Sequence, residues 1–125
     1  MRKNKKEKKL RCIVYLVTKG SLNKTMEKEK KQLRCITEYA KAHNIEMIGI
    51  YHSSGMGQYE VNRQFDQLVR MVEMKQADGI LIKNMQAVSL NVTDAYFKIG
   101  KVRNAGGCIV TVDEGELHFK FTMGG

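Results

Sequence analysis

"CIVYLVTKGS", residues 12–21, joins a run of six apolar side chains to a Lys-Gly-Ser turn. The run is rich in β-branched residues and has no alternating polar positions, which is typical of a strand covered on both faces. Such strands lie inside largely parallel sheets, whose ligands bind at the carboxyl ends of the strands. The turn after Val17 is therefore the first place to look for chemistry.

Apolar runs recur outward from this strand. Further strands are predicted at 45–51, within "ADGILIK" (77–83) and at 108–112. Near the end of the chain, Leu117, Phe119 and Phe121 alternate with polar residues, which predicts a half-exposed edge strand after an acidic turn at 113–116. The sheet should therefore be mostly parallel, with an antiparallel strand at its C-terminal edge.

Helical patterns fill the intervals between the strands. Thr25, Asn62 and Asn91 are the expected N-caps, with Asp94 in the first turn of the third helix. The side chains expected to face the sheet follow the helical spacing and are Leu33, Ile36, Thr37 and Ala40; Phe65, Leu68, Val69 and Val72; and Val92, Ala95, Tyr96 and Ile99. The first helix should end near His43-Asn44 and the third at Gly106-Gly107. Alternating strands and helices predict a three-layer α/β domain over 12–121, after a basic tail at 1–11 and before a C-terminal end at 122–125.

Composition limits the class of protein. A chain of 125 residues with 42% hydrophobic and 28% charged residues fits one compact domain, and no apolar stretch is long enough for a membrane span, so we expect a cytoplasmic protein. Cys12, Cys35 and Cys108 have neither a disulfide nor a zinc spacing and are expected to be small buried apolar residues. His43, His52 and His118 are also far apart, so no metal site and no cofactor is predicted.

Most of the formal charge of +9 lies in the first eleven residues. They contain one glutamate and seven basic residues, Arg2, Lys3, Lys5, Lys6, Lys8, Lys9 and Arg11, which leaves only +3 for the rest of the chain. Such a block can bind DNA weakly through phosphates, with release of counterions and strong salt sensitivity. A solubilising arm without a dedicated partner is the other interpretation, and the sequence leaves both open.

Four loops follow the predicted strands, at 18–24, 52–61, 83–91 and 113–116. None carries the glycine spacing of a Rossmann or a Walker phosphate loop. Lys19, Lys24 and Lys83 lie near strand ends and could form a basic patch, although isolated lysines are usually solvated. Ser21 is a possible nucleophile but is more typical of turn chemistry.

The order of these segments resembles the catalytic domain of serine recombinases, the resolvase and invertase family, from about Arg11 to Glu116. In that family the first strand ends in a Tyr-x-Arg-Val-Ser motif whose serine attacks DNA, and the matching residues are Val14 to Thr18. The segments "QLRCITEYAKAHNIEMIGIY", "YHSSGMGQYEVNRQF", "DGILIKNMQAVSLNVTDAYFKI" and "GGCIVTVDEGE" resemble the family's following helices, strands and loops. The resemblance implies a resolvase-like fold, an origin in a mobile element, and DNA or a recombinase, this chain itself included, as partners.

The departures from the family concern its catalytic residues. Thr18 stands at the serine position and Leu16 at that of the arginine two residues earlier. The family's aspartate, its Asp-Arg pair and its last loop arginine fall at Ser53, Gln86-Ala87 and Leu90. Arg63 matches a family arginine, with Gln64 in place of the next proline.

Guanidinium groups stabilise the charge that develops on phosphate during strand cleavage, and neither leucine nor alanine can replace them. We therefore expect a catalytically defective recombinase-like domain that binds DNA or acts as a partner of an active recombinase. Two alternatives stay open. One is an active strand-transfer enzyme with a rearranged site at Thr18 or Ser21, Arg63 and the loop lysines. The other is an α/β interaction module without a nucleic-acid role. For Thr18, the structural interpretation is a hydroxyl that hydrogen bonds the backbone at a strand end; for Arg63, it is an ion pair or a helix cap.

Overall fold

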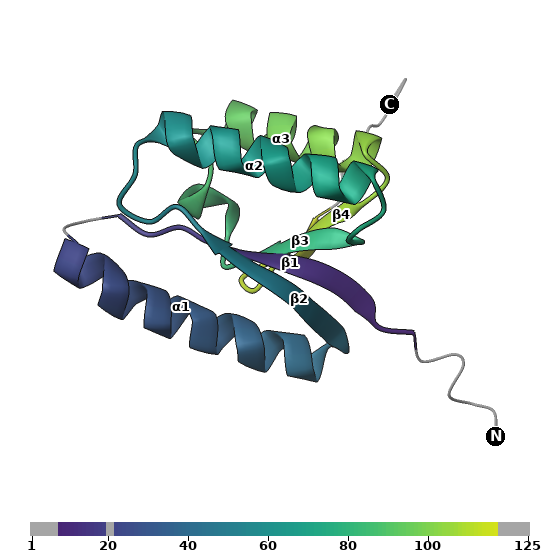
Figure 1. Cartoon of the computed structure of the whole chain (residues 1–125), viewed down its shortest axis with the longest axis horizontal. Coiled ribbons are helices and arrows are strands. Elements are labelled where there is room, and N and C mark those ends of the chain that lie inside the picture. The colour runs from purple at the N-terminus through teal and green to yellow at the C-terminus, as the bar shows by residue number, and fades with distance from the viewer. Residues whose placement is uncertain (1–7, 20–21, 118–125) are drawn as a thin grey trace.

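The computed structural model describes residues 8–19 and 22–117, which form a five-stranded sheet with helices on both faces (Figure 1). The elements follow the order β1 (Leu10–Leu16), α1 (Leu22–Ala42), β2 (Ile45–His52), α2 (Gln58–Glu73), β3 (Gly79–Ile82), the 3₁₀ helix η2 (Met85–Ala87), α3 (Val92–Asn104), β4 (Cys108–Thr111) and β5 (Gly115–Leu117). The strand order is β2-β1-β3-β4-β5. All neighbours are parallel except β4 and β5, so the expected sheet with an antiparallel C-terminal edge strand is confirmed.

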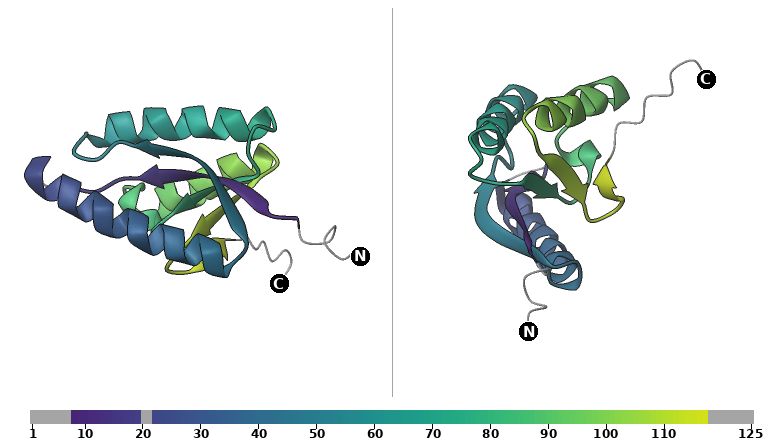
Figure 2. Two further views of the ribbon diagram at one scale, coloured as in Figure 1. Left: turned by 60° about the horizontal axis from the view of Figure 1, so that its bottom comes forward. Right: turned by 90° about the vertical axis from the view of Figure 1, so that its right-hand side faces the viewer.

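Two apolar cores hold the three layers together, with α1 on one face of the sheet and α2 and α3 on the other (Figures 1 and 2). Alternate residues of β1 supply both cores. Ile13 and Tyr15 face α2 and α3, whereas Val14 and Leu16 face α1 and its Ile36. Burial on both faces explains the continuous apolar run that predicted this strand.

Two helix starts differ from the sequence prediction. The first helix, α1, begins at Leu22, and Thr25 lies within its first turns with 3% of its surface exposed. The second, α2, begins at Gln58 after Gly57, which offers no side-chain cap, while Asn62 lies one turn inside and accepts a hydrogen bond from the Gln58 amide. Threonine and asparagine favour N-caps but also occur inside helices, so residue type alone misplaced both starts.

The third helix begins where the sequence predicts. The Asn91 side chain accepts a hydrogen bond from the Asp94 N–H at 2.8 Å, as an N-cap should. The prediction of the inward face of α3 was wrong in part, because Val92 and Tyr96 are 69% and 53% exposed, whereas Ile99 is buried. The helix packs through one side only, which leaves its N-terminal half as an exposed apolar surface.

The cysteines do not share one environment. Cys12 is buried and Cys108 half-buried, and burial raises the pKa of their thiols to about 12 and about 11. Cys35 is exposed on α1, so its expected burial was wrong.

The chain reverses after β4 through a short turn at 112–114 and ends its described part in β5. Thr111 holds this turn, because its hydroxyl accepts the Glu114 N–H at 2.9 Å. Phe119, Phe121 and His118 lie outside the described residues, so the structure covers only the first part of the predicted edge strand. No helix within the described ranges is long and apolar enough to cross a membrane.

Candidate functional site

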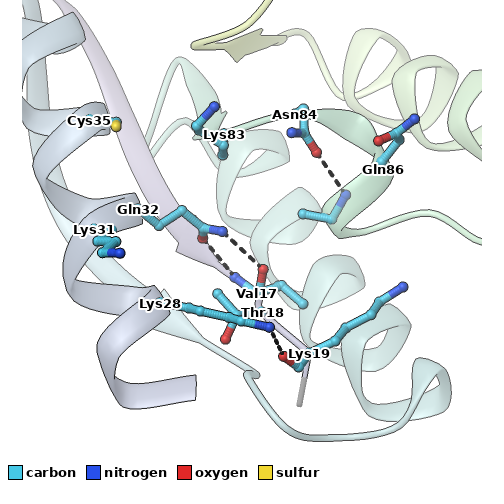
Figure 3. A pocket seen from close by; sticks show the side chains of 11 residues that line it. Val17, Thr18, Lys19, Lys28, Lys31, Gln32, Cys35, Lys83, Asn84 and Gln86 are labelled. Atoms are coloured by element: carbon cyan, nitrogen blue, oxygen red, sulfur yellow. Dashed lines mark hydrogen bonds between the residues drawn. The ribbon is translucent and has the colours of Figure 1, made fainter. Parts of the chain in front are cut away.

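The carboxyl end of β1 is held by a side chain of α1. The amide group of Gln32 accepts the Val17 N–H and donates to the Val17 carbonyl, both at 3.2 Å (Figure 3). Gln32 thereby replaces the neighbouring strand that Val17 lacks on that side, since it supplies one acceptor and one donor. This clamp fixes the position of the next residue, Thr18.

Thr18 is bound through its backbone but not through its side chain. Its N–H donates to the Ser54 hydroxyl at 3.0 Å, and its carbonyl accepts the Gly55 N–H at 3.0 Å. The residue is 8% exposed, and its buried Oγ1 has no hydrogen-bond partner among the described residues. The prediction that this hydroxyl bonds the backbone was therefore wrong, since the backbone groups use the Ser54 side chain and the loop instead.

A cavity of about 500 Å³ opens beside Thr18 between α1 and the η2 segment (Figure 3). Four lysines line it, Lys19, Lys28, Lys31 and Lys83, and no Asp, Glu or Arg does so within the described ranges. The α1 members of this basic cavity are spaced i, i+3, i+4 and i+7, because Lys28, Lys31, Gln32 and Cys35 lie on one face of the helix. The other members come from the ends of β1 and β3 and from η2.

Hydrogen bonds fix the positions of two of these lysines. The Lys28 ammonium donates to the Lys19 carbonyl at 2.7 Å (Figure 3), and the Lys83 ammonium pairs with Asp113 at 2.6 Å. Bonds from Lys83 and from the Asn84 amide hold the pKa of Asp113 below its usual range. Asp113 thus balances Lys83 at one side of the basic cavity, while no described side chain pairs with the ammonium of Lys19 or Lys31.

Ser53, at the position of the family's aspartate, belongs to a buried hydrogen-bond group. The Tyr15 hydroxyl lies 2.9 Å from both the Ser53 Oγ and the Val61 carbonyl. Because a carbonyl can only accept, the Tyr15 proton goes to Val61 and the Ser53 hydroxyl donates to Tyr15. Burial raises the pKa of Tyr15 to about 12, although the Ser53 hydrogen bond lowers it. These hydrogen bonds tie the end of β1 to α2, and the Tyr15 hydroxyl stays protonated at neutral pH.

Arg63 does not take part in the basic cavity. The Arg63 side chain is half exposed on the surface of α2, and its guanidinium donates to Glu60 at 2.8 Å. This bond raises the pKa of Arg63. The interpretation as an ion pair is therefore confirmed. Of the other family positions, Leu16 is buried under α1 and Leu90 is exposed, whereas Gln86 and Ala87 line the basic cavity.

The described part of the basic tail, residues 8–11, lies at the N-terminal end of β1, opposite the basic cavity. Arg2, Lys3, Lys5 and Lys6 fall outside the described residues, and Lys8 and Lys9 are exposed just before the strand. Arg11 belongs to β1 itself, where its backbone N–H donates to Asp78 at 2.8 Å and its side chain pairs with the same carboxylate. These bonds, the backbone one first, lower the pKa of Asp78. Any DNA contact of Arg11 would compete with this pairing.

Sequence reasoning found part of the basic cavity and missed the rest. The structure brings Thr18, Lys19 and Lys83 together, as the strand-end rule predicts. Lys24 lies elsewhere on α1, and Ser21 is outside the described residues. Lys28, Lys31 and the Gln32 clamp were missed, although their shared helical face with Cys35 was a readable signal.

Comparison with known proteins finds similar structures but no matching sequence. Neither a protein-family model nor a curated protein sequence matches the chain. A resolvase family site-specific recombinase from Streptococcus pneumoniae is similar in structure, with a TM-score of 0.71 and 16% sequence identity over 86% of this chain and 74% of that chain.

Two further solved structures are similar. The N-terminal catalytic domain of TP901-1 integrase has a TM-score of 0.66 and 16% identity over 84% of this chain and 78% of its own. The C-terminal catalytic domain of ISC1926 TnpA, an IS607-like serine recombinase, has a TM-score of 0.68 and 19% identity over 82% of this chain and 67% of its own. The chain therefore has the fold of serine recombinase catalytic domains, and the resemblance predicted from its segment order is confirmed at the level of the fold.

Proposed function

We propose that this chain is a recombinase-like domain that binds DNA through backbone phosphates and does not cleave it. The observation that carries the proposal is the basic cavity, where four lysines surround the strand end that holds Thr18. The ammonium groups of Lys19 and Lys31 have neither an ion pair nor a hydrogen bond with a described residue, so they are available to phosphate oxygens. The binding would be independent of sequence, because contacts to phosphate position DNA without reading its bases.

Three features argue against strand cleavage. The Thr18 hydroxyl is buried, whereas a nucleophile must reach phosphorus and pass its proton to a base. Leu16 and Ala87 supply no charge where the family has arginines, and Arg63 is engaged with Glu60. Removing one donor that stabilises a transition state typically lowers a rate by about 10² to 10³. The rearranged strand-transfer site is thus the weaker alternative.

Fluorescence anisotropy of a labelled random-sequence duplex across a salt series tests the binding. We expect the Lys19→Glu/Lys31→Glu variant to lose affinity and to lower the slope of log K against log salt by about 2, since each phosphate contact contributes about 0.9. Lys24→Glu/Lys30→Glu changes the net charge equally at exposed positions of α1 outside the basic cavity and should bind more tightly than the cavity variant. Equal losses in the two variants would refute a site at the basic cavity.

The same samples test the alternatives. A chain lacking residues 1–7 separates the contribution of the tail, and binding that disappears with the tail alone would remove DNA from the role of the folded domain. A denaturing gel reports covalent protein–DNA adducts. We expect none; an adduct that Thr18→Ala abolishes would establish the strand-transfer alternative. If no version binds DNA, the domain is an interaction module without a nucleic-acid role.

A further inference from the structure

A second cavity, of about 620 Å³, lies between the η2–α3 segment and β5. Met85, Ala95, Ile99 and Leu117 contribute apolar walls, and Met85 and Ile99 are themselves buried. The exposed side chains of Val92 and Tyr96 also line it. Its size and its mostly apolar lining are those of small-molecule sites, which combine apolar walls with a few placed polar groups.

Ser89 provides such a polar group. It lines the second cavity and is 8% exposed, and its Oγ has no hydrogen-bond partner among the described residues. The backbone N–H of Ser89 donates to the Met85 carbonyl at 2.9 Å, so the donor without a described partner is the hydroxyl. The Ser89 Oγ is closed off from solvent, as is the Oγ1 of Thr18, so a ligand reaches it only when the Ser89 side chain turns toward the cavity. A ligand that then accepts a hydrogen bond from the hydroxyl recovers the cost of leaving it unpaired.

The charges at this cavity favour a neutral ligand. Lys19 and Glu114 are the charged residues that line it, and their opposite signs cancel. A thioether such as that of Met85 and an aromatic ring such as that of Tyr96 both pack well against aromatic ligands. The lining therefore fits a ring compound with a single acceptor better than it fits an anion or a cation.

We propose that the second cavity binds a small neutral aromatic carbonyl compound. The ring contacts the apolar walls, and the carbonyl oxygen accepts a hydrogen bond from the Ser89 hydroxyl. Lys19 and Gln86 line both cavities, but Ser89 and the apolar walls belong to the second cavity alone, so variants at Ser89 and Ala95 test it apart from the proposed DNA binding.

Acetophenone and ethylbenzene test the proposal, because they have nearly the same shape and differ in the carbonyl group. Titrations of the full chain are followed by ¹H–¹⁵N chemical shifts. We expect saturable shifts at Ser89, Ala95, Ile99 and Leu117 with acetophenone, and binding of ethylbenzene that is weaker by a few-fold to about tenfold, the value of one neutral hydrogen bond. Shifts that do not saturate, or that centre on other residues, would overturn the proposal.

Variants locate the interaction. Ser89→Ala should make the two compounds bind equally, whereas Thr93→Ala, an exposed position of α3 outside the second cavity, should keep their difference. Ala95→Phe fills the space and should abolish binding of both. A preference for acetophenone that survives Ser89→Ala would refute the assigned hydrogen bond. Tighter binding of benzoate or benzylammonium than of acetophenone would refute the assignment to a neutral ligand.

Discussion

Thr18 and Thr111 are buried threonines at the carboxyl ends of β1 and β4, and their hydroxyls differ in hydrogen bonding. The Thr111 hydroxyl accepts the Glu114 N–H at 2.9 Å and donates to the Gly115 carbonyl at 3.3 Å, while that of Thr18 has no described partner. A buried polar group without a partner lowers the stability of the folded state, whereas a paired one supports it.

We therefore expect opposite effects of the same substitution at the two positions. Thr18→Val should raise the free energy of unfolding by about 1 kcal/mol, because it removes an unpaired hydroxyl. Thr111→Val should lower it by about 1 to 3 kcal/mol, because it leaves the Glu114 N–H without its acceptor. Urea denaturation measures both. A loss of stability in Thr18→Val would mean that its hydroxyl is satisfied in solution.

Tyr15 makes a pH dependence measurable. Its pKa is raised from 10.0 to about 12 in the folded chain, so the folded state holds the proton more tightly than the unfolded state. This contribution to stability is complete below pH 10 and is lost as the pH rises toward 12. Tyr15→Phe should lower the free energy of unfolding by about 1 to 3 kcal/mol at neutral pH, because it removes the acceptor of the buried Ser53 hydroxyl and the bond from Tyr15 to the Val61 carbonyl.

The same variant should then lose less stability than the wild type as the pH rises above 10. Denaturant midpoints on a pH series compare the two proteins, and lysines titrate equally in both. Parallel curves would contradict the raised pKa of Tyr15.

At the scale of one element, α3 begins with a charged pair that the surrounding layers bury. The Lys98 side chain is 4% exposed, and its ammonium donates to Asp94 at 2.6 Å and lies 5.8 Å from the Phe65 ring centre. Asp94 also accepts the Leu90 N–H at 3.0 Å, which ties the preceding loop to the helix. Burial alone would raise the pKa of Asp94, but the bonds from Lys98 and Leu90 outweigh it and lower that pKa.

Removing the anion of this pair should be more harmful than removing the cation, because Lys98 is the more deeply buried partner. We expect Asp94→Asn to lower the free energy of unfolding by about 3 kcal/mol, because the Lys98 ammonium stays buried without its counter-ion. Lys98→Met leaves the Asp94 carboxylate, which is 23% exposed and still accepts the Leu90 N–H, so its loss should be clearly smaller. Thermal and urea denaturation compare the two variants, and an equally large loss in Lys98→Met would show that the pair itself provides the stability.

The elements differ in how well the sequence predicts them. The strands β1, β3 and β4 are recognisable because burial on both faces requires continuous apolar runs. The start of α2 is not, because Gly57 provides no capping side chain while Asn62 offers a misleading one. The apolar face of α3 was also mistaken, since Val92 and Tyr96 follow the helical spacing but lie beyond the layer that covers Ile99.

The candidate sites depend on topology more than on any motif. A lysine on a helix is usually solvated, so Lys28 and Lys31 carry no signal until α1 is placed against the ends of β1 and β3. The second cavity needs η2, α3 and β5 together, and Ser89 alone in sequence is an ordinary loop residue. The strand-end rule located the region, but the arrangement of the layers supplies the partners.

At the scale of the whole molecule, the described residues place positive charge at both ends of β1, with Lys8 and Lys9 before the strand and the basic cavity after it. Their separation means that one duplex contacting both would have to pass along the sheet and α1. This geometry makes the tail and the basic cavity separable in the binding experiment, since neither region shares a residue with the other.

A β-bulge in β2 bears on whether two molecules can pair through their sheet edges. The pairing of β1 with β2 steps from Cys12 and Met47 to Ile13 and Gly49, so Ile48 is an extra residue without a partner in β1. This bulge lies in the eight-residue edge strand, whose outer side has no neighbouring strand among the described residues. Bulges disrupt the flat, regular edge that another chain needs in order to add a strand.

We therefore expect the bulge at Ile48 to disfavour edge-to-edge association of β2 with another chain. Deleting it would join Met47 to Gly49 and give an uninterrupted ladder with the same faces buried, so the domain should fold but self-associate. Ile48→Ala removes most of the same apolar side chain and keeps the bulge, so it should remain as dispersed as the wild type. Light scattering across a concentration series compares the two variants. Equal scattering by both would contradict a role of the bulge in preventing self-association. More scattering by the deletion variant alone would mean that one residue without a partner in β1 keeps the molecules separate at the β2 edge of the sheet.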